Sequence, residues 1–375
     1  MKIAHISVVP VADNYGGGIT VCNNLSSLAE LADHLTIAAP SFDMEFIDWL
    51  RQRFSACHIE LVTLKKDIGS LFHFGCFSNY AHSALTAAEY EQYDAIFVEG
   101  TKLGGLVKKV AESDVPVIVN QHNYEPIFVS DKYVGFVYRL LFQLVLALYL
   151  VRSELWAYRY STHFMFVSFR DLACVHELLN KKKLFEKRSE KEVYHPISEA
   201  VRKPPSENAK KNKPLYDILI TGDFSCQRTF SIIQEVMTTL DEEKVIVAGR
   251  NADVFEETDC CEIVDAPSNA EMEELHNASK FLLNINHGFG GVKVKVLSAL
   301  QRQQNVINLG GLPIGYELQD GIIASTKTGI RSKISATKDD IKIHTRFSKE
   351  SARQRVRKIL TGNEGSNGKS AAYTK

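Results

Sequence analysis

A Gly-rich turn that carries two lysines, in "HGFGGVKVKVLSAL" (287–300), has residue types suited to phosphate chemistry. The apolar run "KFLLNIN" before it predicts a strand and "VKVKVLSALQRQ" predicts a helix, so Gly290 and Gly291 fall where a strand leads into a helix N-terminus. Such a terminus offers unpaired N–H groups and partial positive charge, and Lys293 and Lys295 add formal charge. The turn predicts a phosphate-binding site.

Two further strand ends combine a glycine with a nearby arginine. The segment "ILITGDFSCQRTF" ends a strand at Gly222 and carries Arg228 soon after, and "VIVAGRN" ends a strand at Gly249 and continues with Arg250. A guanidinium group can neutralise a phosphate through two parallel hydrogen bonds. Because ligands of parallel sheets bind at the carboxyl ends of the strands, we expect these arginines at the same edge as the lysines, unless they are solvated surface residues.

A run of three glycines follows the first expected strand, in "PVADNYGGGIT". Gly17 and Gly18 allow the backbone to approach a ligand closely, although a flexible connector explains such a run equally well. The spacing is not GxGxxG, and no acid closes the next strand, "LTIAAP". The sequence therefore disfavours a dinucleotide site of the usual kind.

A glutamate and a histidine close two successive strands. Glu99 ends "DAIFVEG", and His122 follows "VPVIVN" within "QHNYE", which also contains Glu125. We expect Glu99 and His122 to meet at the sheet edge as acid–base or hydrogen-bonding groups. The alternative is that His122 and Asn123 only close a turn. Weaker candidates are the isolated histidines His5, His195 and His287.

Several site classes are excluded or disfavoured. The sequence has no HExxH and no His/Asp cluster at metal-ligand spacing, so we expect no protein-bound metal. It has no GxSxG, so covalent serine catalysis is unsupported. Seven cysteines without a CxxC pair indicate reduced thiols of a cytoplasmic protein. The net charge of −1 gives no sign of nucleic-acid binding.

The elements that must position these residues alternate between strands and helices in both halves of the chain. This alternation predicts an α/β fold with two Rossmann-like, doubly wound domains that face a cleft. The expected division is an N-terminal domain (1–198), a polar Pro- and Lys-rich linker (199–214), a C-terminal domain (215–361) and a disordered tail (362–375).

The longest apolar stretch, 133–152, is interrupted by Arg139 and Gln143, which argues against a membrane-spanning helix. A buried helix is favoured, and a face that rests on a membrane is the alternative. The N-terminus is a short strand and not a signal peptide. We therefore expect a cytoplasmic protein, with possible peripheral contact at the cytoplasmic face of the inner membrane.

Five segments together resemble the GT-B glycosyltransferases, and within them the family 4-like, retaining enzymes of bacterial surface polysaccharide assembly. The resemblance runs from residue 1 to about 310 and rests on the segments "YGGGITVCNNLSSLAELADH", "NQHNYE", "ELWAYRYSTHFMFVSFRDL", "ILITGDFS…VIVAGRN" and "HGFGGVKVKVLSAL". It implies transfer of a sugar from a nucleotide-sugar donor to a glycan or lipid-linked acceptor. The nucleotide-sugar is then a substrate, and no cofactor is expected.

The resemblance also assigns roles to the residues above. It places His122 beside the donor sugar, and Arg228 or Arg250 at the leaving phosphate. It makes 1–198 the acceptor-side domain and 215–361 the nucleotide-sugar-binding domain. It places Gly17 and Gly18 near the diphosphate or the donor sugar, and Gly290, Gly291 and Lys295 around the diphosphate. Gly222 and Lys293 are further candidates for donor binding. No metal is needed if the helix dipole and basic side chains carry the leaving-group charge.

The chain departs from the family pattern at two positions. Ser298 stands in "LSAL" where the family has the glutamate that binds the ribose hydroxyls, and the earlier glutamate of the pair falls at Gly290. A serine cannot accept two hydrogen bonds from a vicinal diol as a carboxylate does. Ser298 is nevertheless expected near the ribose.

Three alternatives to a transferase stay open. A GT-B-type nucleotide-sugar epimerase needs acid–base carboxylates, for which Glu99 and Glu125 are the candidates. A degenerate, non-catalytic transferase domain is favoured by Ser298 and disfavoured by His122 and Lys295. An NAD-dependent oxidoreductase is the weakest. The aromatic stretch "LFHFGCFSNYAHSAL" (71–85) is either an acceptor-binding segment or ordinary core.

Overall fold

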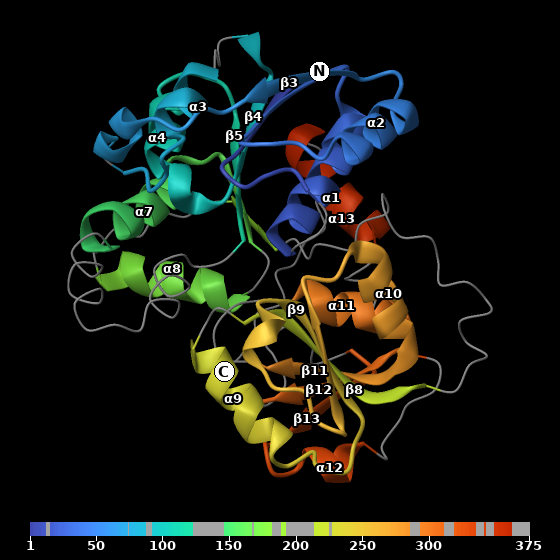
Figure 1. Ribbon diagram of the computed structural model, residues 1–375. Helices are drawn as coiled ribbons and strands as arrows, with labels where there is room; N and C mark the ends of the chain where they lie inside the picture. Colours follow the sequence, from blue (N-terminus) through green and yellow to red (C-terminus); the bar gives the residue numbers. More distant parts are fainter. Residues whose placement is uncertain are drawn as a thin grey trace.

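The protein was examined as a computed structural model, which describes thirteen segments of the chain. These segments are residues 1–12, 16–73, 75–87, 92–122, 146–166, 169–181, 189–192, 214–224, 227–285, 293–310, 319–334, 341–342 and 349–361. They form two lobes, each built around one parallel sheet (Figure 1). The expected linker and tail fall almost wholly outside the described residues, so those two boundaries stay predictions.

The first lobe contains a seven-stranded sheet in the order β3-β2-β1-β4-β5-β6-β7, and every pairing is parallel. Its strands are β1 (Lys2–Ser7), β2 (His34–Ala39), β3 (His58–Thr63), β4 (Ala95–Glu99), β5 (Val117–Gln121), β6 (His163–Phe166) and β7 (Ser189–Glu192). The order reverses between β1 and β4, where Ser7 lies opposite Glu99. In doubly wound sheets such a reversal is where ligands bind.

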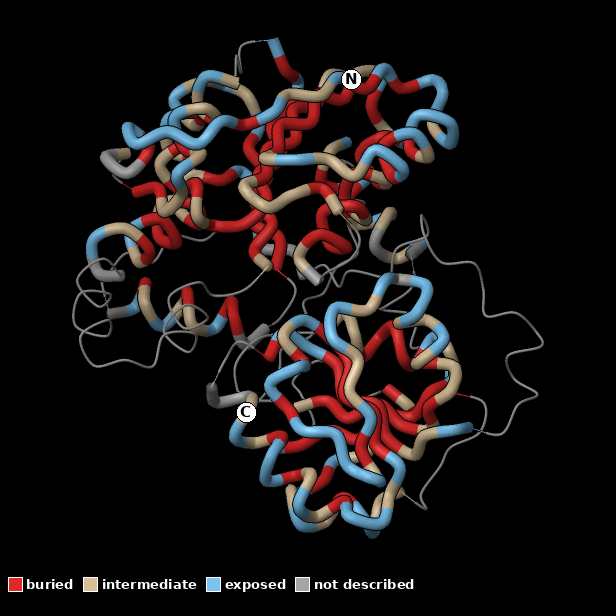
Figure 2. Tube along the Cα trace, viewed as in Figure 1, coloured by how far each residue is buried: buried red, intermediate tan, exposed pale blue. Residues whose placement is uncertain are grey.

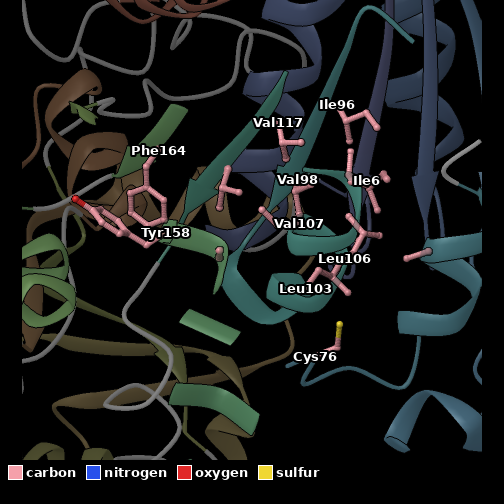
Figure 3. Packing of buried hydrophobic residues seen from close by; sticks show 14 of the residues in the cluster. Ile6, Cys76, Ile96, Val98, Leu103, Leu106, Val107, Val117, Tyr158 and Phe164 are labelled. Carbon is pink, nitrogen blue, oxygen red and sulfur yellow. The ribbon is translucent and has the colours of Figure 1, made fainter. Parts of the chain in front are cut away.

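Helices cover both faces of this sheet because its central strands are apolar on both sides. One core lies between the sheet and the helices α4 (Gly104–Val110), α7 (Val151–Tyr160) and α8 (Phe169–Lys181), and Figure 3 shows its packing. The other core lies under α1 (Gly16–Leu31) and α2 (Met44–Arg53). Shorter elements are α3 (Ala81–Ala87), the 3-10 turns η1 (Ile68–Phe72) and η3 (Thr101–Leu103), and the π-helical turn η4 (Leu146–Leu150).

The last described helix, α13 (Lys349–Thr361), returns to the first lobe. Its Val356 and Ile359 are buried in the core formed with α1 and α2, and Arg353 pairs with Glu30 of α1 at 3.3 Å. Figure 1 shows this red helix beside α1. The expected C-terminal domain, 215–361, includes α13, whereas the apolar side of this helix packs in the first lobe.

The second lobe contains a six-stranded sheet in the order β10-β9-β8-β11-β12-β13, again with parallel pairings only. Its strands are β8 (Tyr216–Asp223), β9 (Val245–Arg250), β10 (Cys261–Asp265), β11 (Ser279–Ile285), β12 (Asn305–Leu309) and β13 (Ile322–Ser325). Its helices are α9 (Gln227–Met237), α10 (Asn269–Ala278), α11 (Val294–Gln301) and α12 (Ile330–Lys333), with the 3-10 turn η6 (Ala252–Val254). Ser268 and Glu271 form a capping box at the start of α10.

This sheet is also buried on both faces, and its order reverses between β8 and β11. Figure 2 shows the buried strands at the centre of each lobe and the exposed residues on the outer helices and loops. The predicted fold class, two doubly wound α/β units, is confirmed. Each unit has one reversal of strand order, and the candidate site residues must be sought there.

The described part of the apolar stretch 133–152 is η4 followed by the start of α7, in which Leu148 is exposed and Leu150 is buried. Residues 133–145 lie outside the described residues. Among the described helices none combines the length and the hydropathy needed to cross a bilayer.

Close packing of α4 against α7 makes Gly104→Ala a test of the first lobe. An alanine Cβ at position 104 would lie 2.0 Å from the carbonyl oxygen of Ser153, which is backbone and cannot move aside cheaply. We expect Gly104→Ala to lower the free energy of unfolding by about 3 kcal/mol or more, as overpacked cores do. Urea denaturation measures this loss. Gly222→Ala, whose added Cβ has no neighbour nearer than 3.7 Å, is the control and should change stability by less than about 1 kcal/mol.

Candidate functional site

The carboxylate of Glu99, the last residue of β4, is completely buried and surrounded by four polar side chains. Its Oε1 lies 3.1 Å from His5 Nε2 and accepts a hydrogen bond from Asn24 Nδ2 at 2.7 Å. Its Oε2 lies 2.5 Å from His122 Nε2 and accepts a hydrogen bond from Asn120 Nδ2 at 2.9 Å. We call these five residues the Glu99 cluster.

The Glu99 cluster lies at the reversal of strand order in the first sheet. His5 comes from β1, Asn120 from β5 and Asn24 from α1, while His122 directly follows β5. The ring of His5 stacks on Phe97 with centroids 5.7 Å apart, which fixes its plane. The predicted meeting of Glu99 with His122 is therefore observed.

The charge state of Glu99 follows from these contacts. Burial alone would raise its pKa, but the charge and hydrogen bond of His122, with the hydrogen bond of His5, hold the pKa of Glu99 well below its ordinary value. The carboxylate is therefore ionised at neutral pH and acts only as an acceptor. It orients His122 and does not deliver a proton.

A second buried carboxylate supports the loop after β4. Glu154 of α7 accepts a hydrogen bond from Thr101 Oγ1 at 2.6 Å and one from Gln121 Nε2 at 3.2 Å. The neighbouring Ser153 hydroxyl donates to the Thr101 carbonyl at 2.5 Å and accepts from the N–H of Gly104. This network ties the carboxyl ends of β4 and β5 to α7, so the segment that carries His122 has a rigid base.

Lys295 occupies the corresponding position in the second lobe. It lies in the first turn of α11, and its Nζ donates a hydrogen bond of 2.9 Å to the carbonyl of Thr221 near the carboxyl end of β8. Burial, with a smaller contribution from the charge of Lys293, lowers the pKa of Lys295 to about 8. An anionic ligand would stabilise the charged form of Lys295, because the charge of the ligand compensates for the hydration that the ammonium group loses on burial.

Lys293, the N-cap residue of α11, connects the two lobes electrostatically. Burial lowers its pKa, and the carboxylate of Asp171 in the first turn of α8 opposes that shift. Because α8 follows β6 of the first sheet and α1 also contacts α11, the carboxyl edges of the two sheets lie toward each other. The lysines and the Glu99 cluster thus belong to facing edges.

The glycines expected at the strand ends are also brought together. Gly222 of β8 lies directly opposite Gly249 of β9, and a Cβ on Gly249 would be 2.1 Å from the carbonyl oxygen of Gly222. Gly249 has a φ of +151°, a conformation that side-chain-bearing residues rarely adopt. Arg250 follows it and is exposed. Glycine at position 249 therefore allows the two strands to end side by side.

Other expected site residues are placed only in part. Gly17 and Gly18 lie in the first turn of α1, and Arg228 lies in the first turn of α9, without a described side chain. The expected residues Gly290, Gly291, Glu125, His195 and His287 lie outside the described residues. Their roles stay predictions.

Ser298 is buried in α11 and faces an arginine one turn later. Arg302 donates hydrogen bonds to the Ser298 hydroxyl at 2.5 Å and to its carbonyl at 2.9 Å, and it lies 4.0 Å from Glu273. Sequence reasoning did not anticipate Arg302, Asn24, Asn120 or Asp171. For Asn24 and Asn120 a signal existed, namely a polar residue in an otherwise apolar helix or strand.

Among the described residues, no group of three or more histidine, cysteine or acidic side chains gathers at metal-binding distances. The described cysteines are free thiols.

No family model matches this sequence, and no curated protein matches it either. Solved structures do match. The catalytic domain of starch synthase IV from Arabidopsis thaliana, bound to ADP and acarbose, superposes with a TM-score of 0.63 at 11% identity, covering 96% of this chain and 99% of that one. WaaG, a glycosyltransferase involved in lipopolysaccharide biosynthesis, gives 0.58 at 14% identity, covering 96% and 90%.

A UDP-GlcNAc 2-epimerase from Neisseria meningitidis, bound to UDP-GlcNAc, also gives 0.58, at 10% identity, covering 97% of this chain and 100% of that one. Similarity at such low identity establishes a shared fold. The chain therefore has the GT-B fold, which transferases and an epimerase both use, and the choice between activities depends on the site.

The Glu99 cluster predicts a characteristic pH dependence of stability. Because the folded-state pKa of Glu99 lies below the ordinary value of 4.5, its stabilising contribution is complete above that pH and is lost as the pH falls through the folded-state pKa. We expect Glu99→Gln to lower the free energy of unfolding at pH 7 by about 3 kcal/mol, as breaking a buried ion pair does.

Urea denaturation between pH 7 and pH 3 tests this expectation, and the difference between wild type and Glu99→Gln should shrink below pH 4.5. Glu60→Gln, at an exposed carboxylate that pairs with His34, is the control and should change little at any pH. A difference for Glu99→Gln that stays constant across the range would contradict the assigned charge state.

Proposed function

We propose that the protein is a glycosyltransferase that moves a sugar from a nucleotide-sugar donor to a glycan or lipid-linked acceptor in bacterial cell-surface polysaccharide biosynthesis. The observation that carries the proposal is the partly buried cation Lys295 at the start of α11, beside the end of β8, on the sheet edge that faces the Glu99 cluster. The glycosyltransferases among its structural neighbours support the same choice.

In this proposal the second lobe holds the donor diphosphate. Lys293 and Lys295, with the N–H groups at the start of α11, would neutralise the charge that develops on the leaving diphosphate. The helix dipole and the lysines make a metal ion unnecessary, so metal independence is part of the proposal. Arg228 and Arg250 are further candidates for the leaving phosphate, and Ser298 for the ribose.

The first lobe contributes His122 beside the donor sugar. Its ring is fixed by Glu99, which is itself fixed by three other side chains, so His122 is already oriented before the donor binds. Gly17 and Gly18 would let the start of α1 approach the same ligand. Retention of the anomeric configuration belongs to the proposal on the resemblance alone.

The epimerase alternative is less well supported by this site. Such an enzyme needs carboxylates that exchange a proton with the sugar. Glu99 is completely buried and both of its oxygens already contact four side chains, so it is poorly placed to do so, and the other candidate, Glu125, lies outside the described residues. The partly buried Lys295 and the Glu99 cluster argue against a non-catalytic domain. Both remove charge from water at a cost to stability that a purely structural domain has no need to carry.

Calorimetric titration with UDP, GDP, ADP, CMP and NAD tests the donor site. We expect one nucleoside diphosphate to bind, and Lys295→Met to weaken that binding about tenfold or more, because a charge-assisted contact is lost. Lys244→Met removes an exposed lysine at the far end of β9 and should leave the affinity unchanged. Binding of NAD alone, or unchanged binding by Lys295→Met, would overturn the proposal.

The same titration should depend on pH. A bound diphosphate raises the pKa of Lys295 from about 8, so binding takes up a proton near and above that pH. We expect the wild-type affinity to fall as the pH rises above about 8, and the affinity of Lys295→Met to vary less over the same range.

We further propose that the first lobe touches the inner membrane through α4 and α7. Trp156 of α7 lies beneath two cations, Lys108 at 4.6 Å and Arg152 at 5.0 Å from its ring centroid. Lys109 and Arg152 are exposed on these helices. Basic side chains combined with an aromatic ring are typical of surfaces that rest on anionic lipid.

Flotation with phosphatidylglycerol vesicles tests this contact. We expect the wild type to float with the vesicles at low salt and to be released by high salt, because the attraction between the cations and the lipid is screened. The double variant Lys109→Glu/Arg152→Glu should stay in the soluble fraction, whereas Lys244→Glu should behave as the wild type. A wild-type protein that never floats would count against membrane contact.

A further inference from the structure

Two histidine side chains from different elements of the first lobe meet outside the Glu99 cluster. His73 directly follows the turn η1, and His82 is the second residue of α3. The Nε2 atom of His73 lies 3.3 Å from the Nδ1 atom of His82, and the ring centroids are 5.6 Å apart with 23° between the ring planes. The two nitrogens therefore face each other, and one ring donates a proton to the other. We call these residues the His73–His82 pair.

One buried residue, Ser70, holds the backbone of both histidines. Its carbonyl accepts a hydrogen bond of 3.3 Å from the N–H of His73, and its hydroxyl accepts one of 2.9 Å from the N–H of His82. The carbonyl of His82 also accepts a hydrogen bond from the hydroxyl of Thr86. The backbone of the pair is thus fixed, whereas the ring of His73 is half-buried and that of His82 is exposed, so both rings can tilt and can be reached from solvent.

The spacing of the two nitrogens is that of two ligands on one metal ion. Zinc bound by histidine has metal–nitrogen bonds of about 2.0–2.1 Å, so two ligands at the tetrahedral angle place their nitrogens about 3.3–3.4 Å apart. The observed separation is 3.3 Å, so a tilt of the rings toward a common point forms the site without moving the nitrogens apart. Imidazole suits Zn²⁺, Cu²⁺ and Ni²⁺, whereas Mg²⁺ and Ca²⁺ prefer oxygen ligands.

A second pair of described histidine rings is arranged differently. The rings of His34 and His58 have centroids 4.8 Å apart and planes tilted by 47°, and the Nε2 atom of His34 lies 3.3 Å from the carboxylate of Glu60. These three side chains do not gather at metal-binding distances. Because both pairs consist of accessible histidines in the first lobe, His34 and His58 provide a matched control.

We propose that the His73–His82 pair binds one divalent transition-metal ion of the Zn²⁺ or Cu²⁺ class. The ion takes the place of the proton between the rings, and the ring that donates this proton binds through the tautomer that is protonated on its other nitrogen. Within the described part of the chain no third histidine, cysteine or acidic side chain completes the group, so water fills the remaining coordination positions. The ion takes no part in the proposed sugar transfer, and the site does not depend on that activity.

A metal ion at the pair would link the two ends of a cavity wall. The stretch 71–85, predicted to be an acceptor-binding segment or ordinary core, contains buried core residues and also Phe77 and Tyr80, which line a cavity of about 560 Å³. Both aromatic residues lie between the two histidines in the chain. Because a link that closes a loop restricts its open states, the bound ion should hold this wall of the cavity in place.

Calorimetric titration of the full chain, without an affinity tag, with Zn²⁺ and with Cu²⁺ tests the proposal. We expect one ion to bind at the pair, and Cu²⁺ to bind more tightly than Zn²⁺. His73→Gln and His82→Gln should each weaken this binding about tenfold or more, since loss of even an outer-shell partner of a metal ligand has such an effect. His58→Gln should leave the affinity unchanged.

Two further measurements locate the ion. The electron paramagnetic resonance spectrum of the Cu²⁺ complex should show coupling to two imidazole nitrogens in the wild type, and to fewer in each single variant. Amide hydrogen exchange in residues 75–82 should become slower when Zn²⁺ is added to the wild type. It should not change in the double variant His73→Gln/His82→Gln, because the link between the ends of the loop cannot form.

Three outcomes would overturn the proposal. They are the absence of Zn²⁺ and Cu²⁺ binding at millimolar concentration, binding that is as tight in the double variant as in the wild type, and an equal loss of binding in His58→Gln. The folded state of the double variant is checked without metal by its circular dichroism and its urea unfolding midpoint, which should match those of the wild type. His82→Gln, a change at an exposed residue, keeps the test decisive if the double variant is less stable.

Discussion

The constraint on which the structure depends is that both sheets are parallel and buried on both faces. Parallel strands need helical crossovers, and the crossovers cover the sheet, so only the strand ends remain for polar chemistry. Where the strand order reverses, neighbouring crossovers go to opposite faces and the carboxyl ends are left open. In this chain the reversals lie between β1 and β4 and between β8 and β11. The Glu99 cluster lies at the first and Lys295 at the second.

The two edges bury charges of opposite sign in different ways. Glu99 is fully compensated within its own lobe by two histidines and two asparagines. Within the described part of the chain, Lys295 donates to the backbone carbonyl of Thr221, and the charge of a second lysine, Lys293, acts on it. The first arrangement is complete without a ligand and fixes the geometry of His122. The second brings the charges of two lysines together, an arrangement that an anionic ligand would stabilise.

The sequence predicted the central strands well and their partners poorly. Runs such as "VPVIVN" and "EKVIVAG" are apolar on both faces and end in turn residues, so the sequence predicts β5 and β9 as strands. The edge strand β3, "HIELVT", alternates in burial, and the sequence pattern does not predict it as a strand. Chain order groups α13 with the second domain, although its apolar side packs in the first lobe. Asn24 and Asp171 reach the site only through tertiary packing, which local periodicity does not encode.

In the proposed transferase, Ser298 stands where the resemblance leads us to expect a glutamate, and this difference separates two parts of donor recognition. Arg302 donates to the Ser298 hydroxyl and carbonyl, so a carboxylate at position 298 would lie directly against that guanidinium. The lysines proposed to bind the donor diphosphate are held instead by Thr221 and by the start of α11, and do not depend on Ser298. Loss of the carboxylate therefore reduces the hydrogen bonding available to a ribose while the anion site persists. A donor bound here would be held mainly through its diphosphate and sugar, the two parts that the lysines and the fixed His122 are placed to contact.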